Sequence, residues 1–359
     1  MSPRFIAAEG LCEIDCRRAL DDSALPWLRT ALDPSEIGRW ITPVVARAEG
    51  RGGKARLLEA RLVRHKPGRR CVVYYEFDVG RRLGIYGKIR ARGADHRTHT
   101  LLRAFESAAL DHAAGTSRVG VPRAIAVVPE LNLTLQCACP GAVVTPLLEQ
   151  VEGVSLMQPV AEALFGFHRA GVEARRSHAI SDELAILRSR LTEAAALAPI
   201  WRERIEQVLE ACCEIASRLD LPQICGIHRD FYSDQVLVDG STVTLLDLDL
   251  FAAGDPALDV GNFSAHLTEL SMRVHATPDR FAAHEKAFEE RYLALAPEVP
   301  RESIRIYRIL TLARHVHLSM TLPGRAAVTG DLLEYCEAQL GLARAESDQK
   351  LSRTRSVRR

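Results

Sequence analysis

The sequence has no apolar run near the roughly 20 residues that a membrane-spanning helix needs. Its first residues carry acids and arginines where a secretory signal would have an apolar core. Nine cysteines, an odd number, show no CxxC pair and no zinc-ligand spacing. The net charge of +1 argues against a strong field for nucleic acid or anionic membrane. These absences predict a cytoplasmic protein with reduced thiols and with neither a nucleic-acid nor a membrane partner.

What is present indicates an ordinary globular chain. Apolar residues make up 47% and charged residues 26% of the sequence. A length of 359 residues exceeds one typical core and predicts two packed units. The oligomeric state is left open.

The N-terminal segment is predicted to be helical. Asp33, Pro34 and Glu36 form the pattern of a helix cap, a proline in the first turn and a glutamate that reaches back to the cap. The helix should run to about Ala48. Residues 1–53 are therefore interpreted as an N-terminal helical extension.

Residues 54–138 are predicted to form a small lobe of strands with one helix. β-branched and aromatic residues and short connectors favour antiparallel hairpins. The expected strands are 55–64, 71–77, 83–90, 123–128 and 131–136, and the expected helix is 97–112.

Residues 139–345 are predicted to be mostly helical, and 346–359 to be a disordered basic tail. A strand-rich interlude at 224–250 has Asp239-Gly240 as its tight turn. Helices are expected at 201–219, from 277–279 onward, at 301–320 and at 331–345. The fold class is thus α+β, with a small antiparallel-sheet lobe before a larger helical lobe, and a cleft between lobes is where cofactor sites tend to form.

The interlude carries the strongest chemical signal. Asp230 lies in a His-x-Asp loop that begins at His228, Gln235 follows five residues after Asp230, and Asp247 ends the next strand. Phosphoryl transfer needs one carboxylate to orient the attacking hydroxyl, and an amide and a carboxylate to hold magnesium. Asp230 is predicted to orient the hydroxyl, whereas Gln235 and Asp247 supply oxygen ligands to the metal. Asp249 is left open as a second metal ligand, a substrate contact or a solvated strand end.

Lys88 is the candidate for nucleotide binding in the first lobe. It is flanked by apolar residues on the third strand, and the alternative is a solvent-facing lysine on an alternating strand. Glu106, on the following helix, is the predicted ion-pair partner of Lys88. Lys66 and Gly68 belong to a basic hairpin whose backbone N–H groups suit a phosphate, although a plain surface turn is the equal alternative.

The run HRDFYSDQVLV…LLDLDLFAAGDPALDVGNF resembles the aminoglycoside phosphotransferase and choline kinase-like superfamily. The resemblance implies a bilobal protein-kinase-like fold, with Asp230 as the catalytic aspartate, Gln235 and Asp247 as metal ligands, and Asp259 as a brace for the catalytic loop. His228 is grouped with the catalytic residues and is expected to hold the loop by hydrogen bonding.

The resemblance also assigns nucleotide contacts. It places Lys88 on the strand that carries the nucleotide lysine, and it places Gln136 to Ala138 where backbone groups hydrogen-bond adenine. One residue departs from the pattern, because the family usually has asparagine where this chain has Gln235.

The predicted function is ATP- and magnesium-dependent transfer of the γ-phosphoryl group to a hydroxyl of a small-molecule substrate. The glutamine at 235 supports an alternative, a catalytically weak or silent nucleotide-binding pseudokinase with a regulatory role. A kinase that acts on proteins is disfavoured, because no long activation segment separates Asp247 from the helix that starts at Pro256.

Overall fold

A computed structural model describes residues 19–50, 54–108, 118–220 and 222–341. Two compact units make up the chain: unit 1 contains residues 1–173 and 234–251, and unit 2 contains residues 174–233 and 252–359. The boundaries predicted near residues 53 and 138 stay predictions. In the described part of the chain, no helix combines the length and the apolar character that a membrane crossing requires.

Unit 1 begins with two helices, α2 (Leu28–Leu32) and α3 (Pro34–Ala48). The predicted cap of α3 is confirmed, because the Asp33 side chain accepts hydrogen bonds from the backbone N–H groups of Ser35 and Glu36. Glutamate at 36 in the first turn also suits the positive end of the helix dipole.

A five-stranded sheet follows, with strand order β1-β2-β3-β6-β5. The β1–β2, β2–β3, β3–β6 and β5–β6 pairs are all antiparallel, which confirms the predicted hairpins. The strands are β1 (Arg56–Lys66), β2 (Arg70–Asp78), β3 (Arg82–Arg90), β5 (Ala124–Val128) and β6 (Leu133–Cys137).

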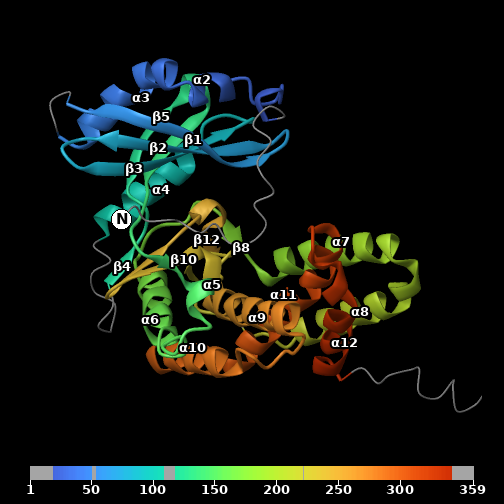
Figure 1. The fold of residues 1–359 in the computed structure, drawn as a ribbon. Coiled ribbons are helices and arrows are strands. Elements are labelled where there is room, and N and C mark those ends of the chain that lie inside the picture. Colours follow the sequence, from blue (N-terminus) through green and yellow to red (C-terminus); the bar gives the residue numbers. More distant parts are fainter. Residues whose placement is uncertain (1–18, 51–53, 109–117, 221, 342–359) are drawn as a thin grey trace, which may run out of the picture. The chain divides into compact units, whose positions relative to one another are not determined.

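The two faces of this sheet differ in chemistry. In β2, Cys71, Val73, Tyr75 and Phe77 alternate with less buried residues and belong to the core that also contains the apolar face of α3. The Tyr75 hydroxyl donates to the Ala31 carbonyl at 3.1 Å, so this buried phenol is paired. Figure 1 shows α2 and α3 along one side of the sheet and α4 on the other.

Helix α4 (His96–Ser107) packs against β5 and β6. It ends before His112, the predicted end, and residues 109–117 lie outside the described residues. Its N-cap is Asp95, whose side chain accepts from the Thr98 N–H.

A second sheet in unit 1 has the order β4-β11-β10-β7. The β10–β11 hairpin turns at Asp239-Gly240 as predicted, with Gly240 at φ 56°, a region that suits glycine. The remaining elements of unit 1 are β4 (Arg118–Gly120), β7 (Ala142–Val143), α5 (Val144–Leu147), α6 (Met157–His168), β10 (Val236–Asp239) and β11 (Thr242–Leu245).

Unit 2 is mainly helical, with a small sheet in the order β8-β12-β9. The predicted helices at 201–219, 301–320 and 331–345 are present with shorter or shifted ends, and α10 begins only at Ala282. Its elements are β8 (Ser177–His178), α7 (Ile180–Leu197), α8 (Arg202–Ala216), β9 (Cys225–Ile227), β12 (Ala252–Gly254), α9 (Pro256–His275), α10 (Ala282–Leu295), α11 (Arg301–Thr321) and α12 (Thr329–Gln339).

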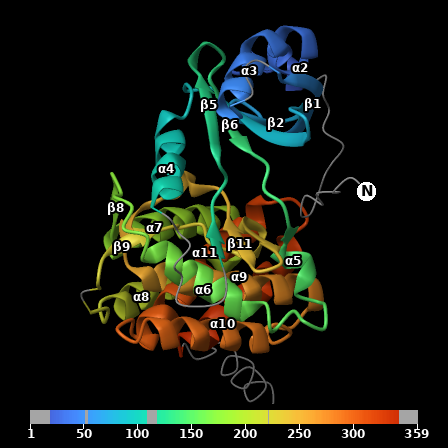
Figure 2. The same cartoon turned by 90° about the vertical axis from the view of Figure 1, so that its left-hand side faces the viewer.

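Helices α9 and α11 lie side by side in unit 2 (Figure 2) and make close contact at Gly261. A Cβ atom at this position would lie 2.7 Å from the Arg308 nitrogen and 2.7 Å from the Ile304 oxygen, both backbone atoms of α11. Gly261 is therefore fixed by helix packing rather than by its own backbone conformation.

We expect Gly261→Ala to destabilise the protein by about 1–3 kcal/mol, because the helices must separate to admit the methyl group. Gly330→Ala is the matched control: its Cβ would meet only the Trp201 ring at 3.7 Å, an ordinary contact. The free energy of unfolding of Gly330→Ala should equal that of the parent or exceed it by up to about 1 kcal/mol. Urea unfolding followed by circular dichroism measures both, and equal stability of the two variants would contradict the packing argument.

Candidate active site

Gln235 and Asp247 lie at the same end of the β10–β11 hairpin in unit 1. Val236 and Leu245 are paired, and the Leu246 N–H donates to the Gln235 carbonyl at 2.8 Å. The hairpin thus brings residues 235 and 247 together just beyond its last pair. Asp247 has φ 58°, an uncommon left-handed conformation for a residue other than glycine.

Lys88 of β3 faces this hairpin end. Its Nζ lies 2.7 Å from Asp247 Oδ1 and 3.5 Å from Asp249 Oδ1, and its side chain is only 14% exposed. The alternative of a solvent-facing lysine is therefore wrong. The alternation along β3 places Lys88 on the face opposite Ile85 and Ile89, which belong to the apolar core.

Asp249 is the centre of a second group of cations. Arg70 Nη1 and Arg90 Nη2 lie 2.9 Å and 2.5 Å from Asp249 Oδ2, and Arg97 donates to the Asp249 backbone carbonyl. Although burial raises the pKa of Asp249, Lys88 and Arg90 outweigh it and hold this pKa well below its usual range. Asp249 is thus half-buried and paired, so the alternative of a solvated strand end is wrong.

Arg90 and Arg97 had no predicted role. Arg90 follows Lys88 by two residues on the same strand, so the strand period alone places both on one face. Arg97 lies in the first turn of α4, and no local signal in the sequence links it to residue 249. The strand periodicity could therefore have identified Arg90, whereas nothing in the sequence identified Arg97.

The predicted ion pair between Lys88 and Glu106 is wrong. Glu106 instead pairs with Arg103 at 3.0 Å and accepts the Ala124 N–H at 2.6 Å. The reason is the rotation of α4, which turns Glu106 toward the start of β5. Asp247 and Asp249 supply the negative charge beside Lys88.

A carboxylate already accepts a hydrogen bond from the backbone of the β1–β2 turn. Gly68, at φ 67°, donates its N–H to Asp22 Oδ2 at 2.8 Å, and His65 Nε2 lies 2.8 Å from the same oxygen. The N–H expected to suit a phosphate is therefore engaged in this structure. Burial lowers the pKa of Lys66, and the neighbouring Arg64 and Arg70 lower it further, so this turn has a surplus of positive charge.

The segment predicted to contact adenine belongs to the end of β6. Gln136 pairs with Tyr86 of β3, and the Ala138 N–H donates to the Gly84 carbonyl at 2.9 Å. That N–H is satisfied within the protein. Contacts of Gln136 and Ala138 with a nucleotide stay predictions.

In unit 2, the loop at 228–230 is held by one buried carboxylate. Asp259 of α9 is fully buried and accepts the N–H groups of His228 and Arg229, each at 2.6 Å. Arg229 has φ 71°, a strained conformation that persists only where surrounding contacts impose it. Asp259 supplies those contacts.

His228 supports the same loop from the other side. Its ring is fully buried, and its Nδ1 accepts the Asp230 N–H at 3.3 Å. The Asn262 amide donates to the Phe231 carbonyl at 3.0 Å, which fixes the backbone just after Asp230. These contacts orient the backbone that carries Asp230.

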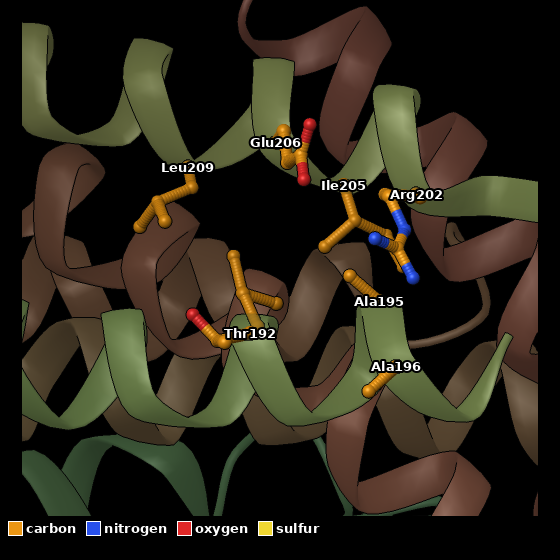
Figure 3. Close-up of a pocket in the computed structure, with 8 residues that line it drawn as sticks. Thr192, Ala195, Ala196, Arg202, Ile205, Glu206 and Leu209 are labelled. Carbon is orange, nitrogen blue, oxygen red and sulfur yellow. The ribbon is translucent and has the colours of Figure 1, made fainter. Parts of the chain in front are cut away.

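A cavity in unit 2 contains none of the predicted site residues. It measures about 180 Å³ and lies between α7 and α8, where Leu191, Ala195, Ile205 and Leu209 line it (Figure 3). Its few polar groups, on Thr192, Arg202 and Glu206, form no set that suits a reaction.

Residues 90–300 match the model of the phosphotransferase enzyme family. The chain belongs to this family. It is a small-molecule phosphotransferase whose acceptor group is a hydroxyl. No curated protein sequence matches this phosphotransferase.

Solved structures show the same fold at low identity. A thermostable mutant of aminoglycoside phosphotransferase APH(4)-Ia, in ternary complex with ADP and hygromycin B, has 15% identity and a TM-score of 0.58, covering 85% of this chain and 99% of that one. A choline/ethanolamine kinase family protein from Mesorhizobium loti has 14% identity and a TM-score of 0.54, covering 86% and 95%. A putative aminoglycoside phosphotransferase from Ralstonia eutropha has 12% identity and a TM-score of 0.55, covering 86% and 98%. The predicted bilobal kinase-like fold is confirmed.

The donor set of the phosphotransferase suits magnesium. Magnesium prefers oxygen ligands and usually takes one or two carboxylates together with substrate phosphates. Asp247 offers a carboxylate, and Gln235 offers a side-chain carbonyl from the same hairpin end. Among the described residues, no group of three or more His, Cys, Asp or Glu side chains could hold a metal ion.

We expect Asp259→Ala to destabilise the phosphotransferase by about 3 kcal/mol or more, because two buried N–H groups lose a charged acceptor. Amide exchange at His228 and Arg229 should accelerate, a readout that general destabilisation of a distant site would not produce. Asp255→Ala is the control, since it removes the N-cap of the same helix, worth about 1 kcal/mol, and the hydrogen bond of Asp255 with Tyr307, but no acceptor of the His228 and Arg229 amides. Unchanged exchange at both amides in Asp259→Ala would show that the brace is not what holds the loop.

Proposed function

We propose that this phosphotransferase transfers the γ-phosphoryl group of ATP, with magnesium, to a hydroxyl group of a small molecule. Two structures of similar fold support the nucleotide: one contains AMP-PNP with hygromycin B, and the other contains ADP with hygromycin B. The choline/ethanolamine kinase family protein of similar fold widens the acceptors beyond antibiotics.

The observation that carries the proposal is the pairing of Lys88 with Asp247 at the end of the β10–β11 hairpin. Lys88 is ion-paired with two carboxylates and is the group that would bind nucleotide phosphates. Asp247 and Gln235 would hold the metal. When bound, magnesium neutralises phosphate charge that grows toward the transition state.

Asp230 is the residue that would orient the acceptor. Phosphoryl transfer has a loose transition state in most analyses, so alignment of the hydroxyl counts for more than a strong base. The contacts of His228, Asp259 and Asn262 with this loop support such a role, because they fix the backbone on both sides of Asp230. Asp230 would accept the hydroxyl hydrogen bond and aim the oxygen at phosphorus.

A protein substrate is disfavoured by the chain between the hairpin and α9. Only η5 (Leu248–Leu250) and β12 separate Asp247 from Pro256, which is the first residue of α9. That stretch is too short for a long segment that would bind an extended peptide.

Three substitutions test the assignments. Asp230→Asn and Asp247→Asn should each reduce transfer by at least about 10³-fold, since positioning and charge neutralisation carry most of this catalysis. Lys88→Ala should chiefly raise the KM for ATP. Asp239→Asn, in the exposed hairpin turn, is the matched control and should leave transfer unchanged. Coupled-enzyme assays with ATP, magnesium and a panel of hydroxylated metabolites give the values, and full turnover in Asp230→Asn would refute the assignment of Asp230.

Gln235 is tested through the metal. Gln235→Ala removes one oxygen ligand and should raise the magnesium concentration needed for half-maximal activity several-fold. Gln235→Asn keeps the oxygen on a shorter side chain with one less rotatable bond, so that concentration should fall or stay the same. An unchanged magnesium requirement in Gln235→Ala would remove Gln235 from the ligand set. ATP binding without any metal-dependent transfer in the parent protein would select the silent regulatory alternative.

A further inference from the structure

A carboxylate from the N-terminal part of unit 1 holds the turn between β1 and β2. Asp22 Oδ2 accepts the Gly68 N–H at 2.8 Å and lies 2.8 Å from His65 Nε2, while Asp22 Oδ1 accepts the Ala24 N–H at 3.0 Å. The side chains of Asp22 and His65 are only 9% and 10% exposed. One carboxylate thus links its own segment to a turn 46 residues further along the chain.

The segment that carries Asp22 is anchored in the core of unit 1. Leu25 and Leu28 are buried in the same core cluster as Cys71 and Tyr75 of β2. The Leu25 N–H donates to the Asp22 carbonyl at 3.0 Å, so the packing of Leu25 also fixes the backbone at Asp22. The carboxylate therefore has a defined position against the turn.

His65 and Lys66, at the end of β1, lie on opposite faces of the sheet. His65 pairs with Cys71, which is 1% exposed in the core, and Lys66 pairs with Arg70. Successive side chains of a strand alternate between the two faces. The contact of His65 with Asp22 on the core side therefore directs Lys66 to the other face.

Lys66 ends a row of basic residues that crosses three strands. It is opposite Arg70, and Arg70 is opposite Arg90 of β3. Arg70 and Arg90 share Asp249, at 2.9 and 2.5 Å, whereas Lys66 forms no ion pair with any described residue. Burial and neighbouring arginines lower the pKa of Lys66, and Asp247 acts in the opposite direction. A bound phosphate would act as Asp247 does, because a nearby negative charge favours the charged amine.

We propose that Asp22 is a positioning residue for nucleotide binding: it holds the β1–β2 turn from the core side, so that the Lys66 amine faces the phosphates of ATP. This inference rests on the proposed function and gives the N-terminal segment a part in it. Asp22 acts through the turn and touches no phosphate. Its contacts order the Lys66 backbone before the nucleotide arrives, so binding does not have to supply the free energy of ordering.

The test compares a nucleotide with its nucleoside as ligands of the full chain. Affinities for AMP-PNP with magnesium and for adenosine are measured by calorimetry without any acceptor. Asp22→Ala should weaken AMP-PNP binding by about tenfold, the loss that corresponds to one hydrogen bond to a charged group. Adenosine affinity should stay unchanged, because adenosine has no phosphate to meet Lys66.

Two further variants at the same place serve as controls. Asp22→Asn keeps an oxygen acceptor for the Gly68 N–H and should bind AMP-PNP nearly as tightly as the parent. Asp21→Ala is the matched control, because Asp21 is the neighbouring aspartate, exposed and paired with Arg29 at 2.9 Å. It should leave both affinities unchanged.

A double-mutant cycle tests whether Asp22 acts through Lys66. Lys66→Ala should weaken AMP-PNP binding at least as much as Asp22→Ala does, and combining the two should cause no further loss, since coupled residues depart from additivity. Exchange of the Gly68 amide should accelerate in Asp22→Ala but not in Lys66→Ala. This readout separates release of the turn from loss of the amine.

Additive losses in the double variant, or equal losses of AMP-PNP and adenosine affinity in Asp22→Ala, would overturn the proposal, because Asp22 would then stabilise unit 1 in general. Tighter AMP-PNP binding by Asp22→Ala would also overturn it, by showing that Asp22 competes with phosphate for the Gly68 N–H. Unchanged AMP-PNP affinity in Asp22→Ala would refute this inference alone, whereas a parent protein that binds no AMP-PNP would refute the proposed function itself.

Discussion

The two hydrogen bonds from His228 and Arg229 to Asp259 are the constraint on which the site in unit 2 depends. A positive φ costs free energy at a residue other than glycine, and without these hydrogen bonds nothing would offset that cost at Arg229. The strain lies at Arg229, whereas the Asp259 side chain that stabilises it belongs to α9. The loop geometry therefore depends on the position of this helix. Gly261, two residues further along α9, permits the close approach of α11 that keeps this helix in place.

A different constraint acts in unit 1, where partly buried positive and negative side chains must balance. Lys88, Arg70 and Arg90 converge on Asp247 and Asp249 in a partly buried setting where unpaired charge is costly. The same cations that satisfy the aspartates here are the ones with which a phosphate group would interact. The aspartates therefore keep a strongly basic sheet face compatible with a stable fold.

The sequence predicted the local features well, because local rules determine them. The Asp33 cap, the hairpin of β1 and β2 and the turn at Gly240 each depend on neighbours within a few residues. Apart from the ends of helices such as α4 and α10, the errors involve contacts between residues far apart in the chain. The rotation of α4 decided the partner of Glu106, and a carboxylate at Asp22 took the Gly68 N–H, and neither could be read from spacing.

Selectivity for the acceptor cannot come from Asp230, because a carboxylate that only orients a hydroxyl accepts any hydroxyl presented to it. Discrimination must then come from the groups that hold the rest of the acceptor.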